Sequence, residues 1–177
     1  SCGADRLTLT TFTAACAPDG PGLFHCQDAF TTTPCQDLGA VCFLGSCVSA
    51  TPAGAQDVLF TELLLLPTSP TGHFVELTNI TPALLDLSGT VLRHSNGATF
   101  TLPSSPPVLV APGDQLVLGD TPGGAVDVGW AGFVPGQTGT LRLLRGTTVL
   151  DELTYGAGFP ATAGTGIWAK RRPLPST

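Results

Sequence analysis

The stretch LFTELLLLPTSPTGHFVELTN, residues 59–79, holds two apolar runs separated by a loop of proline, threonine, serine and glycine. Short apolar runs bounded by turn residues are typical of β-strands. Each run carries one acidic residue, Glu62 in the first and Glu76 in the second. Because carboxylates are seldom fully buried without partners, the stretch predicts two strands whose acids form a catalytic pair, a metal site or part of the scaffold.

The composition of the whole chain indicates an all-β protein. Of its 177 residues, 22 are glycine and 16 are proline, and only 11% are charged, against roughly a quarter in ordinary soluble domains. Strand-like segments recur between turn signals, as in a β-sandwich or barrel. Asn96-Gly97 predicts a hairpin in which both turn positions take positive φ. The expected strands after the first 56 residues cover residues 58–66, 74–79, 91–94, 99–102, 115–119, 141–144 and 149–155.

All six cysteines lie near the start of the chain, in a segment rich in glycine, proline and threonine. An even number of cysteines in so short a segment indicates three disulfide bonds formed in an oxidising compartment. Such a segment buries little apolar surface, so disulfides supply stability that its core lacks. The spacing does not choose among the possible pairings. The residues are Cys2, Cys16, Cys26, Cys35, Cys42 and Cys47.

Two alternatives for the cysteines remain open. Cys42 and Cys47 have a spacing that zinc ligands use, although a second close pair is missing. Lipidation of Cys2 would leave an odd number of cysteines for disulfide pairing.

The chain is expected to contain two modules. Residues 1–48 form the small disulfide-stapled module, and residues 49–56 (SATPAGAQ) are small and uncharged, as linkers often are. Residues 57–170 form the β-sandwich, and residues 171–177 form a tail. The disulfides favour an extracellular, periplasmic or cell-surface location.

The negative net charge of the chain makes nucleic acids unlikely partners. At −6 the chain is a poor match for nucleic-acid phosphates, which proteins neutralise with clustered Lys and Arg. The exception is the basic run Lys170-Arg171-Arg172, which is expected to be a solvated tail. No apolar run approaches the length of a membrane-spanning helix, so no membrane span is expected.

A series of short motifs follows the linker in a characteristic order. They are TE at 61–62, FVELTN at 74–79, DLSG at 86–89, FTLP at 100–103, LVAPG at 109–113 and TGTLRLL at 138–144. Together they resemble the lamin tail domain of nuclear lamins and bacterial secreted proteins, over about residues 57–168. The family often has Trp after the Leu-Ser-Gly turn, where this chain has Thr90. The resemblance implies an immunoglobulin-like β-sandwich in which Glu62 and Glu76 occupy positions that usually hold an acid.

The two glutamates have a structural and a catalytic interpretation. In the structural one they are buried acids that accept hydrogen bonds from backbone or hydroxyl groups, or pair with Arg93 or Arg142, and so fix the strand register. Strand alternation places Phe60, Glu62 and Leu64 on one face. The alternative is a hydrolase in which the two carboxylates flank a substrate, as in glycosidases.

Other sites are less well supported. His73 lies three residues before Glu76, so a strand puts the two on opposite faces, and His94 precedes a turn. Calcium would favour a loop cluster of acids, whereas Asp114, Asp120 and Asp127 are spread out. Neither a nucleophile elbow nor a phosphate-binding loop occurs. Asn79-Ile80-Thr81 matches a glycosylation sequon.

The sequence therefore favours a non-enzymatic extracellular or cell-surface module of a bacterial secreted protein, with a binding or structural role. No cofactor and no metal are expected, and the partner is a protein or surface of unknown identity. Loops at 67–72, 104–107 and 122–136 are the expected contact segments. A nucleic-acid-associated role is a further alternative, since lamin-tail-like domains in bacteria accompany nucleases.

Overall fold

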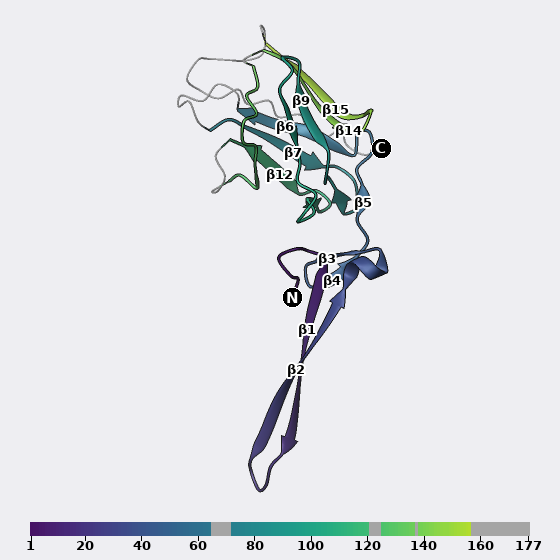
Figure 1. Ribbon diagram of the computed structural model, residues 1–177, viewed down its shortest axis with the longest axis vertical. Coiled ribbons are helices and arrows are strands. Elements are labelled where there is room, and N and C mark those ends of the chain that lie inside the picture. Colours follow the sequence, from purple (N-terminus) through teal and green to yellow (C-terminus); the bar gives the residue numbers. More distant parts are fainter. Residues whose placement is uncertain (65–71, 121–124, 137, 157–177) are drawn as a thin grey trace. The chain divides into compact units, whose positions relative to one another are not determined.

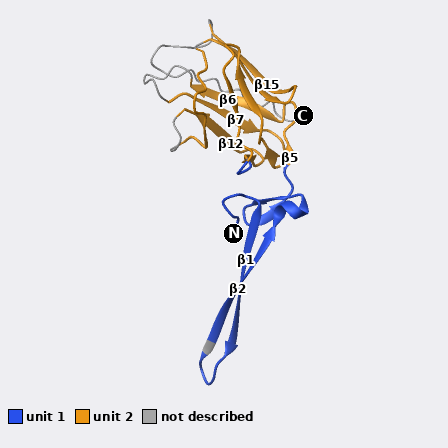
Figure 2. Ribbon diagram, viewed as in Figure 1, with its two compact units in different colours: residues 1–50, 105–107 blue, residues 51–104, 108–177 orange. Residues whose placement is uncertain are grey.

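The computed structural model describes residues 1–64, 72–120, 125–136 and 138–156 (Figure 1). Strands dominate these residues, and the one helical segment among them is a short 3-10 helix, η1 (Cys35–Leu38). The all-β prediction is therefore confirmed. The chain forms two compact units, one of Ser1–Ala50 with Ser105–Pro107 and one of Thr51–Ser104 with Val108–Thr177 (Figure 2).

Unit 1 is built on a long antiparallel ribbon. Strands β1 (Thr8–Pro18) and β2 (Phe24–Pro34) pair in unbroken register, from Thr8 opposite Pro34 to Pro18 opposite Phe24. Threonine is abundant in both strands and favours this conformation. The connecting turn contains Gly20 and Gly22, both at positive φ, which glycine adopts readily. A second, small hairpin follows, made of β3 (Val41–Phe43) and β4 (Ser46–Val48).

Three disulfides hold unit 1 together, as the disulfide-rich prediction requires. Cys2–Cys42 joins the N-terminal residues to β3, and Cys35–Cys47 joins η1 to β4. Cys16–Cys26 lies within the ribbon, between directly opposite residues. Cys35 and Cys42 are fully buried, so the disulfides themselves form much of the interior of the base of this unit.

Unit 2 contains two four-stranded sheets. One has the order β10-β9-β14-β15 and the other has the order β13-β12-β7-β6. Figure 1 shows β6, β7 and β12 side by side in one layer. A third sheet has the order β11-β8-β5. The strands are β5 (Thr51–Pro52), β6 (Val58–Leu64), β7 (Phe74–Asn79), β8 (Leu85–Asp86), β9 (Val91–His94), β10 (Thr99–Thr101), β11 (Leu109–Val110), β12 (Gln115–Gly119), β13 (Val128–Gly129), β14 (Gly139–Arg145) and β15 (Thr148–Tyr155).

One apolar core lies between the two four-stranded sheets, which gives unit 2 a sandwich-like architecture. Alternate residues of each strand point into it, such as Leu141 and Leu143 from β14 and Val75 and Leu77 from β7, all fully buried. Trp130, also fully buried, packs against Phe133 with ring centroids 5.0 Å apart. Aromatic side chains bury the largest apolar areas, and Trp130 is the largest fully buried side chain described.

The expected strands of unit 2 are found within the described residues, and residues 65 and 66 of the first one lie outside them. The predicted orientation of the side chains along β6 is wrong in one respect. The ladder between β6 and β7 shifts between Phe60 and Glu62, a β-bulge at Thr61. Phe60 and Leu63 therefore both face the core, whereas Glu62 and Leu64 are half-buried. The prediction that Phe60, Glu62 and Leu64 share one face is wrong, because a bulge inserts one residue and reverses the alternation beyond it.

The Asn96-Gly97 hairpin forms by a different turn from the one expected. The amide of Gly97 donates to the carbonyl of His94 at 3.0 Å, and Gly97 takes a φ of 97°. Asn96 is not among the non-glycine residues with positive φ. The turn is thus an ordinary type I turn followed by a glycine at positive φ, the common longer hairpin loop.

Part of the expected linker belongs to unit 2. Within residues 49–56, Thr51–Pro52 forms β5, which pairs in parallel with β8, and Ala53 is buried in the core. The expected end of the sandwich at residue 170 and the tail at 171–177 lie outside the described residues.

Candidate functional site

Glu62 and Glu76 are cross-strand neighbours. They lie directly opposite each other on β6 and β7, a pairing that brings side chains into contact. Both are half-buried, so they are less enclosed than the expected buried acids. The two carboxylates therefore lie close together on one surface of the sheet.

Glu76 is held by hydrogen bonds from two side chains. The Thr61 hydroxyl donates to Glu76 Oε1 at 2.6 Å, and the Gln115 side-chain amide donates to the same oxygen at 2.9 Å. Thr61 also lies 2.7 Å from the hydroxyl of Thr78. The β-bulge at Thr61, which reverses the predicted alternation of β6, turns the Thr61 hydroxyl toward these partners. The carboxylate of Glu76 thus joins three adjacent strands, β6, β7 and β12.

The sequon asparagine is part of the framework. Asn79 is fully buried, and its side-chain amide donates to the carbonyls of Ala83 and Val110 at 2.8 and 2.9 Å. Its side-chain oxygen accepts from the amide and hydroxyl of Thr81, both at 2.8 Å. An amide with both hydrogens engaged and no exposed surface is not a glycosylation acceptor in the folded protein.

Three of the candidate metal ligands, His73, Asp120 and Asp127, take part in local hydrogen bonds. His73 is half-buried, and its Nδ1 lies 2.6 Å from Asp120 Oδ2. Asp120 also accepts from the amides of Gly72 and His73 at 2.8 and 3.2 Å. Asp127 accepts from the amide of Val117 at 2.8 Å. Among the residues that the structure describes, no three His, Cys, Asp or Glu side chains are grouped to hold a metal ion.

Two titratable groups are shifted by their surroundings. Tyr155 is 3% exposed and donates from its hydroxyl to the carbonyl of Gly136 at 2.7 Å. Its burial raises its pKa, because the phenolate would lose hydration. In unit 1, the amide of Leu7 and then the hydroxyl of Thr8 lower the pKa of Asp5 by hydrogen bonding to its carboxylate.

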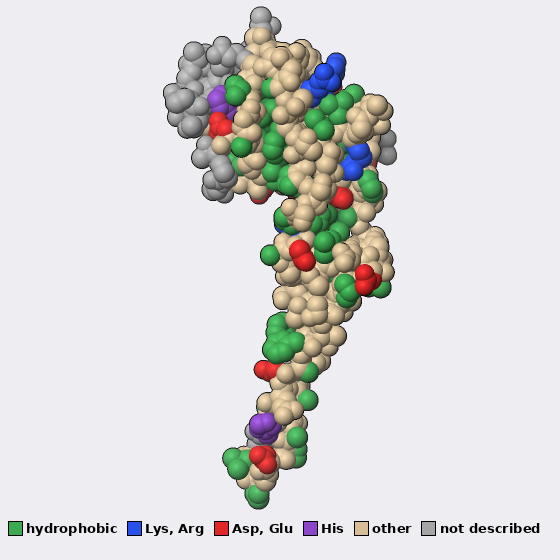
Figure 3. Space-filling model, in the orientation of Figure 1, with side chains coloured by type: hydrophobic (Ala, Val, Ile, Leu, Met, Phe, Trp, Pro, Cys, Tyr) green, Lys and Arg blue, Asp and Glu red, His purple; other side chains and the backbone are tan. Residues whose placement is uncertain are grey.

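The β1–β2 ribbon of unit 1, which was not predicted from the sequence, carries a pair of exposed aromatic side chains. From Thr11 to Pro18 every residue of β1 is exposed. Phe12 and Phe30 lie directly opposite each other with ring centroids 4.8 Å apart, and are 61% and 65% exposed. Figure 3 shows hydrophobic side chains on this ribbon amid a mostly uncharged surface. The signal in the sequence is the equal spacing of Cys16 and Cys26 from the Gly-Pro-Gly turn.

The outer edge of β1 is closed at one end and open at the other. The amide of Thr10 donates to the carbonyl of Ser1, and the amide of Gly3 donates to the carbonyl of Thr8, both at 2.8 Å. These contacts cover the edge as far as Thr10. Beyond it the described residues place no strand against β1 on the side away from β2. Unpaired edge groups are a template for another strand.

Comparison with known proteins adds no family assignment: the chain matches no protein-family model and no curated protein sequence. Within the described residues, no helix has the length and apolar character needed to cross a membrane. The basic run at 170–172, and parts of the loops at 67–72 and 122–136, lie outside the described residues.

Proposed function

We propose that this chain is a non-enzymatic extracellular binding module of a bacterial secreted protein. Its sandwich is of the lamin-tail, immunoglobulin-like type and acts as a scaffold. Its binding element is the free edge of β1 in the ribbon, which adds an extended segment of a partner protein as a new strand. Three disulfides support an oxidising, extracellular setting.

The observation that carries the proposal is the open, uncharged edge of β1 beside the exposed Phe12–Phe30 pair. An isolated two-stranded ribbon is marginally stable in water, and here the Cys16–Cys26 disulfide ties it near its tip. Natural proteins protect exposed edges with charges, above all Lys. Strand β1 (TLTTFTAACAP) has no charged residue, whereas β2 has Asp28. The β1 edge therefore suits strand addition, with Phe12 as an apolar anchor.

The pairing geometry identifies which backbone groups face outward. In an antiparallel ladder, directly opposite residues alternate between hydrogen-bonded and non-hydrogen-bonded pairs. The Cα atoms are closer together in the non-hydrogen-bonded pairs. Cys16 and Cys26 have Cα atoms 4.0 Å apart, so they are a non-hydrogen-bonded pair. Ala14 and Phe12 lie two and four residues before Cys16, so they also belong to non-hydrogen-bonded pairs. The N–H groups of Ala14 and Phe12 therefore point away from β2. The N–H of Thr10, in the same alternation, also points away from β2 and donates to the carbonyl of Ser1.

The test uses peptides selected on the intact protein from a displayed library of unstructured sequences. Ala14→Pro removes one outward N–H of β1 without removing a hydrogen bond between β1 and β2. This substitution is expected to lower the affinity for the selected peptides at least tenfold. Asp28→Pro is the matched control, because Asp28 lies opposite Ala14 and its N–H faces the other edge. Selected peptides that bind the Ala14→Pro protein as tightly as the parent protein refute strand addition at β1.

The hydrolase alternative makes a different prediction for the two glutamates. A scaffold role is supported by the hydrogen bonds that Glu76 accepts from Thr61 and Gln115. Glu62→Gln and Glu76→Gln proteins that keep their melting temperature but lose turnover of a glycoside or ester substrate would support an enzyme and contradict the binding-module proposal.

A further inference from the structure

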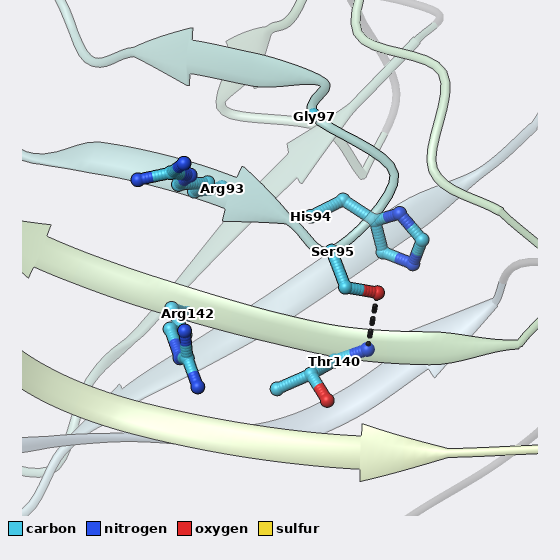
Figure 4. A pocket seen from close by; sticks show the side chains of 6 residues that line it. All are labelled: Arg93, His94, Ser95, Gly97, Thr140 and Arg142. Carbon is cyan, nitrogen blue, oxygen red and sulfur yellow. Dashed lines mark hydrogen bonds between the residues drawn. The ribbon is translucent and has the colours of Figure 1, made fainter.

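A row of polar side chains lies in unit 2, on the face of the β9–β14 pair that points away from the core. Leu92 and Leu143 face inward and are fully buried, so the alternating residues Arg93 and Arg142 face outward. The two arginines are directly opposite each other in the ladder. Figure 4 shows them on neighbouring strands, with Ser95 and Thr140 beside them. These residues line a pocket of about 270 Å³.

The charges in this row do not cancel. Across the sheet the row reads Thr99, Arg93, Arg142 and Glu152. Arg142 donates from Nε to the carboxylate of Glu152, whereas Arg93 makes no ion pair with any residue in the described part of the chain. Two like charges directly opposite each other in a sheet are unfavourable. Two guanidinium groups with one neighbouring carboxylate therefore leave one uncompensated positive charge, in a chain of net charge −6.

The pocket also offers a fixed hydroxyl. The backbone amide of Thr140 donates to Ser95 Oγ at 3.1 Å, drawn as a dashed line in Figure 4. This bond orients the serine and leaves its own hydrogen available to an acceptor. Ser95 is further positioned by His94, which is buried and whose Nδ1 accepts from the amide of Asn96 at 3.1 Å. Thus a donor is held in place next to the two cations.

We infer that this pocket, lined by Arg93, Arg142, Ser95 and Thr140, binds the oxyanion group of a small ligand: a sulfate, a phosphate or a carboxylate. Guanidinium groups match these anions because their planar N–H forks donate two hydrogen bonds at once. Arg93 supplies the uncommitted charge, Arg142 supplies the N–H groups that Glu152 does not use, and Ser95 supplies a neutral donor. The inference is independent of strand addition at β1, which involves unit 1.

The test is a titration of the intact, ¹⁵N-labelled protein with sodium sulfate, sodium phosphate or sodium acetate, each at an ionic strength held constant with sodium chloride. Saturable shifts of the Nε–H signals of Arg93 and Arg142, with a dissociation constant on the order of 1 mM, are expected for a site of a few charge-assisted hydrogen bonds. The anion with the lowest constant identifies the preferred oxyanion. Linear shifts that match those of the exposed Arg6 in unit 1 overturn the inference.

Variants separate the pocket from general charge effects. Arg93→Gln and Arg142→Gln are each expected to weaken anion binding roughly tenfold or more. Arg6→Gln removes the same charge from unit 1 and is expected to leave the affinity unchanged. Glu152→Gln removes the competing carboxylate and is expected to tighten binding several-fold. An Arg93→Gln protein that retains the parent affinity, or an Arg6→Gln protein that loses it equally, refutes the site.

Discussion

The carboxylate of Asp151 accepts a hydrogen bond from the backbone amide of Phe60 at 2.9 Å, and this bond joins the two sheets of unit 2. Among the residues that the structure describes, β6 is the edge strand of its sheet, so no described strand pairs with its outward N–H groups. Asp151, on β15 of the other sheet, is 8% exposed and Phe60 is 1% exposed. A buried side chain thus closes an edge that would otherwise present an unsatisfied donor.

Replacing Asp151 is expected to destabilise unit 2 substantially. Asp151→Ala leaves the buried Phe60 amide without an acceptor and is expected to lower the free energy of unfolding by about 1–3 kcal/mol. Asp151→Asn keeps an acceptor oxygen and is expected to lower it by less. Chemical denaturation followed by tryptophan fluorescence measures both. The control is Glu152→Ala at the exposed neighbour, whose surface ion pair with Arg142 is worth about 0–1 kcal/mol. An equal loss in the two alanine variants would contradict the role given to Asp151.

Glu76 is expected to contribute to stability through its hydrogen bonds and not through its charge. Glu76→Ala removes the acceptor of Thr61 and Gln115 and is expected to lower the free energy of unfolding by about 1–2 kcal/mol. Glu76→Gln keeps an acceptor oxygen for Thr61 and Gln115, so the loss of stability is expected to be smaller. Thermal unfolding of the two variants tests this order. A larger loss in the glutamine variant would show that the negative charge itself is required.

The strands of unit 2 follow from local sequence, whereas the features around the sites follow from tertiary pairing. The FVELTN segment alternates cleanly and forms β7 as predicted. The bulge at Thr61 was not predictable, because any β-branched residue fits a regular strand as well, and it alone decides that Glu62 faces away from Phe60. Likewise, Arg93 and Arg142 are far apart in sequence and meet only because β9 pairs with β14.

In unit 1 the cysteine pattern predicts the disulfides, whereas the sequence does not predict the two long strands β1 and β2. The runs on either side of the Gly-Pro-Gly turn are rich in threonine and alanine, not in large apolar residues, so they lack the period of a half-buried strand. They form a ribbon exposed on both sides, with a disulfide in place of a core. The absence of apolar alternation is therefore a consequence of the structure and not evidence against strands.

The disulfide pairing has a direct chemical test. Complete reduction is expected to raise the mass by about 6 Da, two hydrogens for each of three bonds. Peptide mapping without reductant is expected to recover Cys2 with Cys42, Cys16 with Cys26 and Cys35 with Cys47. Any other pairing, or a mass that does not change, would contradict the arrangement of unit 1.

Removing one disulfide is expected to affect the ribbon alone. In a Cys16→Ser, Cys26→Ser protein the two exposed strands lose their covalent link, and an unsupported two-stranded ribbon is marginal in water. The amides of the hydrogen-bonded pairs from Thr11–Thr31 to Ala15–Gln27 are expected to exchange with deuterium at least tenfold faster, while the paired amides of β7 and β14 keep their rates. Unchanged exchange in the ribbon would mean that pairing and the Phe12–Phe30 contact suffice to hold it.

Tyr155 gives unit 2 a stability that depends on alkaline pH. Burial raises its pKa above the ordinary value of 10.0, so the folded state disfavours the phenolate more than the unfolded state does. The contribution is complete below pH 10 and is lost as the pH rises from there through the folded-state pKa. Because Tyr155 is the chain's one tyrosine, the near-ultraviolet absorbance of phenolate reports this group alone. We expect it to appear well above pH 10 in the folded protein and near pH 10 in denaturant. Tyr155→Phe removes this pH dependence, and a native protein that ionises near pH 10 would show that the hydroxyl is not enclosed beside Gly136.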